Sequence, residues 1–139
     1  MVDYRRQLEI EAYKTVTLLK VVLPYYQAAR PHDANIELTI EVAEEWMVGK
    51  TERVAETQDK VWRESFKQVN VADEDQHANI IAHAAAYLTD ALRTYESDDS
   101  QKVKLQAIFE SRLASSEVSR ILGILVRSHK LWGNRVVRV

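Results

Sequence analysis

The sequence that decides the fold is ANIIAHAAAYLTDAL, which occupies residues 78–92. It carries six alanines, whose small side chains let a neighbouring helix approach closely. Ile81, Leu88 and Leu92 recur at helical spacing and supply bulk between the alanines. We therefore predict an alanine-rich helix from about residue 74 to residue 96, with other helices packed against it.

Three further helices are expected before this segment, over residues 4–29, 34–48 and 52–69, because apolar residues recur there at helical spacing. Pro24 lies inside the first of them and predicts a kink or a break, since proline removes a backbone hydrogen bond and clashes with a preceding carbonyl. The expected apolar sides of the three helices are Leu8, Ala12, Leu19, Val22 and Tyr26; Ile36, Ile40, Ala43 and Met47; and Ala55, Trp62, Phe66 and Val69.

Helix ends are marked by polar residues and glycine. Asp33 and Thr51 are suited to the N-cap position, and Asp73 with Gln76 three residues later matches a capping box. Gly49 is placed where a left-handed C-terminal residue is expected. The short turn around it predicts that the helices on either side are antiparallel neighbours.

The C-terminal part begins with a polar loop at residues 97–100. Residues 100–132 are expected to be helical, with Ser115 and Ser116 as a point at which one helix could become two. Its first apolar residues are Leu105, Ile108, Phe109 and Leu113, and after the two serines Val118, Ile121, Leu122 and Leu125 continue an apolar stripe. Residues 133–139 alternate basic and apolar types and are predicted to form a flexible tail.

The overall prediction is an all-α, single-domain bundle of five to six mostly antiparallel helices over residues 1–132. Only three glycines and two prolines occur in 139 residues, which favours long helices over folds rich in turns. The absence of cysteine excludes disulfides and cysteine-based metal centres. A net charge of −2 disfavours a dedicated nucleic-acid binder, and the short apolar runs predict no membrane span and a cytoplasmic protein.

Catalytic motifs are scarce. The sequence contains no Gly-x-Ser-x-Gly elbow, no glycine-rich phosphate loop and no His-Glu-x-x-His pattern. His77 and His83 are six residues apart, so a helix points them to different sides, and His32 and His129 are expected in a loop and near a helix end. Structural roles are the expected ones for all four histidines.

Carboxylates are the one group that could carry metal chemistry. Glu37 and Glu41 share a helical face with Glu44 or Glu45 in the second expected helix. In the third, Glu56 and Asp59 lie three residues apart, and an antiparallel arrangement could bring the two sets together. Converging carboxylates in a helical bundle can hold Mg²⁺ for nucleotide chemistry. The alternative interpretation is a solvated acidic face opposite the core stripe.

These acids resemble the motif of the all-α nucleoside triphosphate pyrophosphohydrolases, in which Glu-Glu-x-x-Glu is followed by a turn and Glu-x-x-Asp. Residues 56–59 fit the second half, whereas Leu38 stands where the first half has a second adjacent glutamate. The resemblance implies a Mg²⁺ site formed by Glu37, Glu41, Glu56 and Asp59.

Aromatic and basic side chains leave binding roles open. Trp46, Trp62 and Trp132 fall on or beside apolar stripes, where core packing is expected, although an exposed tryptophan would mark a binding surface. The C-terminal end is locally basic, which suits either an acidic partner or a solvated helix end. The residues concerned are Arg127, Lys130, Arg135 and Arg138.

Four segments form a further pattern. They are a Leu-Pro-aromatic stretch at 22–26, a Pro-x-Asp loop at 29–33, an Ile-Glu-x-Ala-x-x-Trp helix at 40–46 that closes at Gly49, and the alanine run at 82–87. Together these segments resemble the immunity proteins of bacterial polymorphic toxin systems. The resemblance implies a small helical protein that binds a cognate toxin and blocks it without catalysis. It carries over no individual functional residue.

Three functions therefore follow as hypotheses. The leading one is a non-enzymatic protein-binding domain without cofactor, similar to immunity proteins, whose partner is a protein toxin. The second is the Mg²⁺-dependent pyrophosphohydrolase. The third is a homo-oligomeric scaffold whose interface is built from the tryptophan and alanine surfaces.

Overall fold

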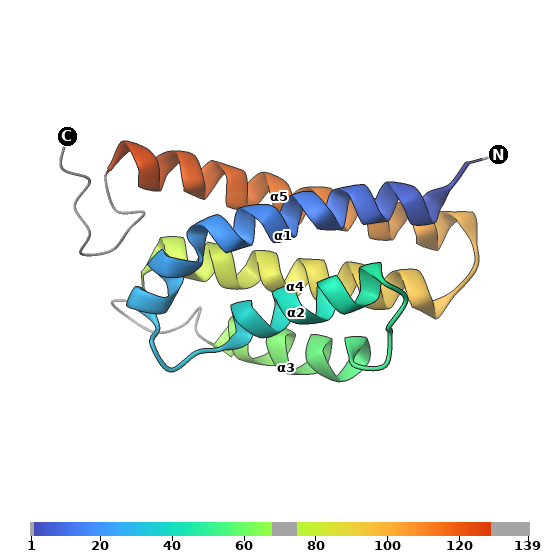
Figure 1. Ribbon diagram of the computed structural model, residues 1–139, viewed down its shortest axis with the longest axis horizontal. Helices are drawn as coiled ribbons and strands as arrows, with labels where there is room; N and C mark the ends of the chain where they lie inside the picture. Colours follow the sequence, from blue (N-terminus) through green and yellow to red (C-terminus); the bar gives the residue numbers. More distant parts are fainter. Residues whose placement is uncertain (1, 68–74, 129–139) are drawn as a thin grey trace.

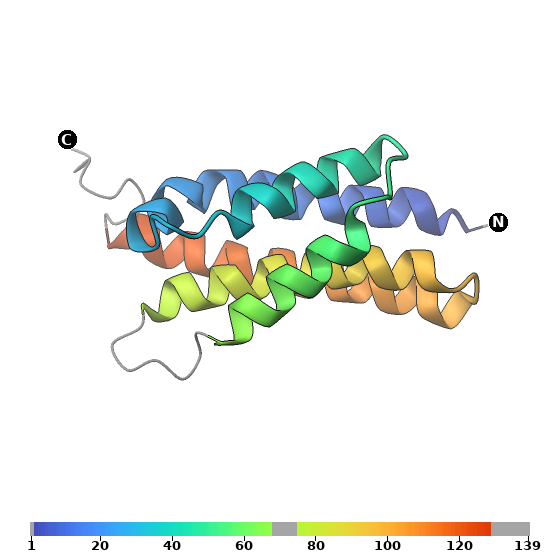
Figure 2. The same cartoon turned by 90° about the horizontal axis from the view of Figure 1, so that it is seen from below.

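Five α-helices make up the part of the chain that the computed structural model describes, which is residues 2–67 and 75–128. Consecutive helices run in alternating directions, so that α1 and α5 are parallel neighbours on one side of the bundle (Figures 1 and 2). The prediction of an all-α single domain is confirmed. The helices are α1 (Tyr4–Ala29), α2 (Asn35–Met47), α3 (Val54–Lys67), α4 (Gln76–Ser97) and α5 (Gln101–Arg127).

The alanine-rich helix α4 is the centre of the bundle, because it contacts each of the other four helices. Its six alanines are all buried, and so are Ile81, Leu88 and Leu92 between them. Small side chains allow the surrounding helices to pack closely, while the larger ones fill the space between alanine positions. The buried alanines are Ala78, Ala82, Ala84, Ala85, Ala86 and Ala91.

The first two helices bury the stripes that their periodicity predicts. Every residue of the α1 stripe from Leu8 to Tyr26 is inaccessible to solvent, and Ile36, Ile40 and Ala43 of α2 are buried. Trp46 is also fully buried, with Tyr95 packed edge-on at 5.8 Å between ring centroids. This tryptophan and the α4 alanines therefore form the intramolecular core, so the described part of the chain does not present them as an oligomer interface.

The helix ends agree in part with the predicted signals. Gly49 adopts φ +90°, the left-handed conformation expected after α2. The carboxylate of Asp33 accepts a hydrogen bond from the backbone N–H of Asn35 at 2.8 Å. Because α2 starts at Asn35, the N-cap position itself is occupied by Ala34. At α4 the observed cap is Asp75, whose carboxylate accepts from the N–H groups of His77 and Ala78. The capping residue predicted for this helix, at position 73, lies outside the described residues.

Pro24 does not interrupt α1, which continues as one helix to Ala29. Of the two alternatives predicted at Pro24, the break is wrong, whereas a kink within the continuous helix stays a prediction. Val22, Tyr25 and Tyr26 on both sides of the proline are buried, so core packing holds the helix through the missing hydrogen bond. Likewise α5 passes through Ser115 and Ser116 without interruption, which answers the question of one helix or two in favour of one as far as Arg127.

The faces predicted for α3 and α5 are partly wrong. Trp62 is 36 % exposed and Ala55 is exposed, while α3 instead buries Val54 and Val61 together with three polar residues. The three buried polar residues are Thr57, Gln58 and Ser65. They are buried because they lie on the face of α3 that packs against α4. In α5, Ile108 is buried as expected, but Leu105, Phe109 and Leu113 are exposed. The first half of this helix instead buries Ala107, Ser111 and Ala114 beside Ile108. In the second half the predicted stripe is confirmed, because Val118, Ile121 and Leu125 are buried and Leu122 packs against the core.

Several predictions fall on residues that are not described. They concern Val69, His129, Lys130, Trp132 and the proposed tail at 133–139. Within the described ranges, no helix combines the length and the apolar character needed to cross a membrane.

Candidate functional site

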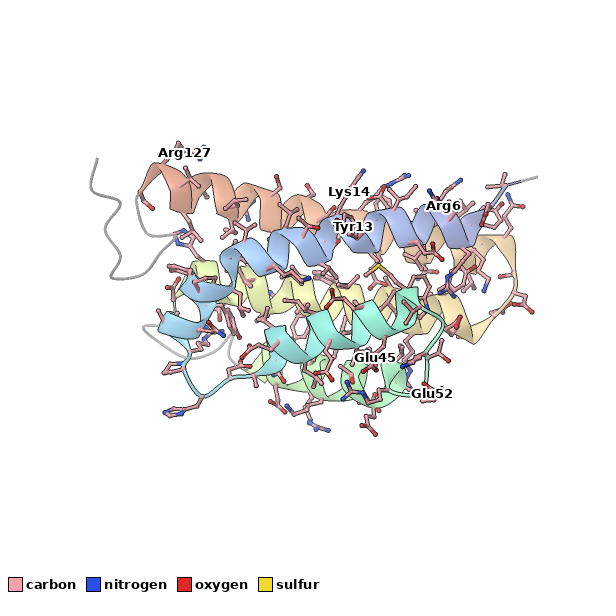
Figure 3. All side chains as sticks on the ribbon, in the orientation of Figure 1. Arg6, Tyr13, Lys14, Glu45, Glu52 and Arg127 are labelled. Atoms are coloured by element: carbon pink, nitrogen blue, oxygen red, sulfur yellow. The ribbon has the colours of Figure 1, made fainter. Side chains whose placement is uncertain are left out.

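The outer face of α1 carries the most exposed aromatic side chain of the described residues, Tyr13, which is 65 % exposed. Ile10, one turn earlier, is 44 % exposed. Both residues lie on the side of α1 away from its buried stripe, so nothing in the core fixes their identity. Figure 3 shows Arg6, Tyr13 and Lys14 in succession along this face.

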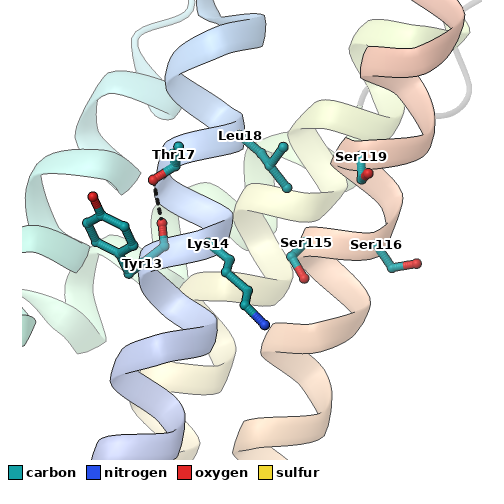
Figure 4. A pocket seen from close by; sticks show the side chains of 7 residues that line it. All are labelled: Tyr13, Lys14, Thr17, Leu18, Ser115, Ser116 and Ser119. Carbon is teal, nitrogen blue, oxygen red and sulfur yellow. Dashed lines mark hydrogen bonds between the residues drawn. The ribbon is translucent and has the colours of Figure 1, made fainter.

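A groove of about 500 Å³ lies on one side of Tyr13, between α1 and α5. Lys14 and Leu18 project towards α5, which presents three serines to the groove, whereas the ring of Tyr13 points to the other side of α1 (Figure 4). Serine side chains of α5 form one wall of the groove, and Lys14, Thr17 and Leu18 of α1 form the other. The serines are Ser115, Ser116 and Ser119.

A second groove, of about 340 Å³, lies on the opposite side of Tyr13, between α1 and α2. It is lined by Arg6, Glu9, Ile10 and Met47 in addition to Tyr13 and Lys14. The two grooves therefore share Tyr13 and Lys14 as the ridge between them. We call this area, made of the residues that line both grooves, the Tyr13 surface.

Positive charge borders the Tyr13 surface. Lys14 lies 3.6 Å from Glu11, and Arg112 of α5 lies 3.2 Å from the same carboxylate, so one buried acid serves two cations. Arg6 is exposed and makes no ion pair with another described residue. An apolar surface with an exposed aromatic and a cationic border can bind a protein that presents apolar side chains next to carboxylates.

Two of the four acids predicted to bind Mg²⁺, Glu41 and Asp59, are bonded to arginines. Arg53, which directly precedes α3, donates to Glu41 at 2.6 Å and to Glu45 at 2.7 Å. These hydrogen bonds lower the pKa of Glu45 and raise that of the Arg53 guanidinium. Arg53 thus joins α2 to α3 at the point where the sequence suggested a metal.

Of the remaining predicted ligands, Glu37 lines the same groove as Glu41, whereas the two acids of α3 do not line it. Asp59 accepts from Arg93 of α4 at 2.7 Å, Glu56 is exposed, and Glu37 faces a groove between α1 and α2. Among the described residues, no group of three or more histidine, aspartate or glutamate side chains is arranged to hold a metal ion.

A second pair of acids was not predicted. Glu110 of α5 shares a hydrogen bond with Asp90 of α4, and its buried Oε1 atom has no hydrogen-bond partner in the described part of the chain. Burial, the hydrogen bond and the charge of Asp90 together raise the pKa of Glu110 to about 9. Gln58 of α3 also donates to Asp90, at 3.0 Å. Because these residues are far apart in sequence, no local spacing could reveal the pair.

The two ends of the bundle are closed by different polar contacts. At one end, Arg5 stacks on Trp46 at 3.8 Å and donates to its carbonyl at 2.6 Å, while Lys104 lies 3.7 Å above the ring of Tyr95. These contacts join α1, α2, α4 and α5, and they account for the buried position of Trp46.

At the other end, tyrosine hydroxyls donate to carboxylates. Tyr25 bonds to Asp75, and Tyr26 bonds to Asp33 at 2.7 Å. Burial and these carboxylates raise the pKa of both phenols. The Leu-Pro-Tyr-Tyr and Pro-His-Asp segments of the family resemblance therefore have a structural role here. Their hydrogen bonds connect α1 to the loop that follows it and to the start of α4.

The histidines of the described part do not converge. His83 stacks on Phe66 at 4.6 Å, and burial lowers its pKa. His77 lies near Asp75 at the start of α4, and His32 is exposed in the loop after α1. Phe66 packs on the imidazole of His83, whose buried Nε2 atom has no hydrogen-bond partner among the described residues.

Sequence analysis missed the Tyr13 surface, although a signal was present. Ile10 and Tyr13 are apolar residues that lie outside the buried stripe of α1, which is unusual for a helix with one core-facing side.

Compared with known proteins, the chain matches no protein-family model, no curated protein and no solved structure.

Proposed function

We propose that this chain is a non-enzymatic binding protein that neutralises a protein toxin by covering it, and that it does so through the Tyr13 surface. The observation that carries the proposal is Tyr13 itself, an aromatic side chain exposed on a ridge between two grooves. The resemblance of the Leu-Pro-aromatic, Pro-x-Asp and Ile-Glu-x-Ala-x-x-Trp segments to immunity proteins supplies the class of partner.

Exposed aromatic side chains dominate the energetics of many interfaces, because they bury a large area at a low cost in conformational entropy. The main chain under Tyr13 is held by the buried residues Leu8, Ala12 and Val16 of the same helix. Thr17 further bonds the carbonyl of Tyr13 at 2.9 Å. A preorganised surface of this kind loses little freedom on binding, which favours affinity.

The chemistry of the surface defines the partner. An apolar side chain of the toxin fits either groove, and acidic groups beside it meet Arg6, Lys14 and Arg112. Immunity then follows from steric occlusion and needs no bond to be made or broken. We expect affinity to fall with added salt, because the border of the site is cationic.

The test starts from the gene next to the one for this chain. Its product, or the C-terminal domain of that product, is expressed with and without the chain, and growth is measured. We expect toxicity without the chain and growth with it, together with a direct complex of the two purified proteins by calorimetry. A non-toxic neighbour that does not bind would reject the proposal.

Tyr13→Ala then locates the site. We expect it to weaken the complex about 30-fold or more, which corresponds to a hot-spot residue. Phe109→Ala is the matched control, because Phe109 is a similarly exposed aromatic (60 %) on a different helix face. If toxin binding is unchanged by Tyr13→Ala, the Tyr13 surface is not the binding site.

A further inference from the structure

Three large apolar side chains form a line on the outer face of α5. Leu105, Phe109 and Leu113 follow one another at four-residue intervals and are 45 %, 60 % and 45 % exposed. At this spacing they lie on one side of the helix. We call this line the α5 stripe.

Neighbouring helices leave the α5 stripe uncovered in the described part of the chain. On one side α5 meets α1, where Arg112 pairs with Glu11 and Thr15 bonds the carbonyl of Ser111. On the other side it meets α4, where Glu110 shares its hydrogen bond with Asp90. The stripe faces away from both contacts. Exposing a row of leucine and phenylalanine side chains to water is unfavourable, so such a patch often marks an interaction surface.

One charged pair within α5 flanks the stripe with opposite signs about Phe109. Lys102 lies seven residues before Phe109, and Glu117 lies eight residues after it. In an antiparallel pair of such helices, the base of one copy is therefore nearly level with the acid of the other, about 10–12 Å from the centre at the helical rise per residue.

We propose that the α5 stripe binds the α5 stripe of a second copy of this chain, with the two helices antiparallel and Phe109 at the two-fold axis. Leu105 of one copy then meets Leu113 of the other, and Lys102 meets Glu117. A two-fold contact of this kind is self-complementary and closes as a dimer. It involves a different face from the tryptophan and alanine surfaces that the sequence suggested, and it does not depend on the proposed function.

The dimer is expected to be weak. One helix pair buries less than the roughly 800 Å² per partner of a standard interface. Glu117 also has a partner within its own helix, Arg120 at 2.8 Å, so the intermolecular contact adds to an existing pair. We expect dissociation in the micromolar range or weaker, and a monomer at nanomolar concentrations.

Sedimentation of the full chain from about 1 to 500 µM tests the dimer, with concentrations set around the expected micromolar range. We expect the mass to rise from that of one chain towards that of two, and Phe109→Asp to weaken association at least tenfold. Val126→Asp is the matched control, because Val126 is 53 % exposed on the same helix but off the stripe. A monomer at all concentrations, or a dimer that Phe109→Asp leaves intact, overturns the proposal.

Two further variants test the antiparallel register. Lys102→Glu and Glu117→Lys are each expected to weaken the dimer about threefold, and the two together are expected to restore it. Because the chain has no cysteine, Phe109→Cys should also form an intermolecular disulfide under mild oxidation, whereas Val126→Cys should not. Failure of the double variant to restore the dimer, or equal crosslinking of the two cysteine variants, overturns this register.

Discussion

Two groups of acidic side chains in this molecule are neutralised in different ways. On α2, Glu41 and Glu45 share one guanidinium, that of Arg53, at 2.6 and 2.7 Å. Between α4 and α5, Glu110 is placed against Asp90, and its pKa is raised to about 9. A hydrogen bond from Arg53 lowers the pKa of Glu45, whereas burial and a neighbouring acid raise the pKa of Glu110.

The contrast shows what acid density in a sequence can and cannot indicate. The α2 acids are conspicuous in the sequence, yet they lie near the surface with cationic partners. Asp90 and Glu110 are inconspicuous, yet Glu110 is the acid with the largest change in pKa among the described residues. The pKa of an acid is shifted by burial and by its neighbours in space, and not by the number of acids along a helix.

The largest expected effect is that of Glu110→Gln on the pH dependence of stability. An ordinary glutamate pKa is about 4.5, so between that pH and pH 9 the folded state binds the Glu110 proton more tightly than the unfolded state. The free energy of unfolding contributed by this group therefore falls as pH rises through this interval, and it is fully present below pH 4.5. Glutamine keeps a donor towards Asp90 at every pH and removes the dependence.

Urea unfolding at pH 5 and pH 8 measures this effect. We expect the variant and the parent to be nearly equal at pH 5, and the variant to be more stable by about 2 kcal/mol at pH 8, a value that allows for partial solvent screening. Glu117→Gln, in an exposed ion pair on the same helix, is the control and should leave the pH dependence unchanged. Equal pH slopes for Glu110→Gln and the parent would show that Glu110 is ionised in the folded protein.

A smaller effect is expected when the cation between α2 and α3 is removed. Arg53→Ala leaves Glu41 and Glu45 without their shared partner, and we expect the melting temperature to fall by about 2 °C in low salt. The difference should shrink in 0.5 M NaCl, since these charges are near the solvent. Arg63→Ala, an exposed arginine of the same helix, is the control. If salt leaves the Arg53→Ala effect undiminished, the arginine acts through packing and not through charge.

Much of the helical architecture could be predicted, because helix formation depends on local spacing. The stripe of α1, the core positions of α2 and the alanines of α4 are buried as their periodicity indicated, and Gly49 has the backbone conformation expected of it. These elements have one apolar face each, so periodicity alone identifies the side that meets the core.

The buried faces of α3 and α5 could not be predicted in the same way. Each of these helices has large apolar residues on one side and small or polar residues on another. In α5 the small residues Ala107, Ser111 and Ala114 are buried, because α1 and α4 approach closely there, while Phe109 is left outside. Such a choice depends on the positions of neighbouring helices, which the sequence of one helix does not contain.

The candidate site was less predictable than the fold. Tyr13 and Ile10 fall off the buried stripe of α1 and could have been noticed, but their significance depends on the grooves beside them. Those grooves combine residues of α1 with Met47 of α2 and the serines of α5. Only the folded arrangement brings these segments together.

The smallest expected effect is that of Mg²⁺ on the parent protein. For a magnesium site to form at the predicted acids, the ion must displace Arg53 from Glu41 and Arg93 from Asp59, two charge-assisted hydrogen bonds of 2.6 and 2.7 Å. We therefore expect 10 mM Mg²⁺, a concentration well above that of ordinary magnesium sites, to leave the melting temperature unchanged within about 1 °C. Nucleoside triphosphates should remain intact in the same mixture.

A pyrophosphohydrolase would behave differently in both measurements. Mg²⁺ would raise the melting temperature in proportion to the logarithm of its concentration, because a ligand that binds only the folded state stabilises it by mass action. Release of pyrophosphate would depend on Glu41, so that Glu41→Gln would abolish it while Glu52→Gln, an exposed acid outside the predicted set, would not. That pair of results would mean that the two arginines yield to the metal and that the α2 acids, despite their cationic partners, are a catalytic site after all.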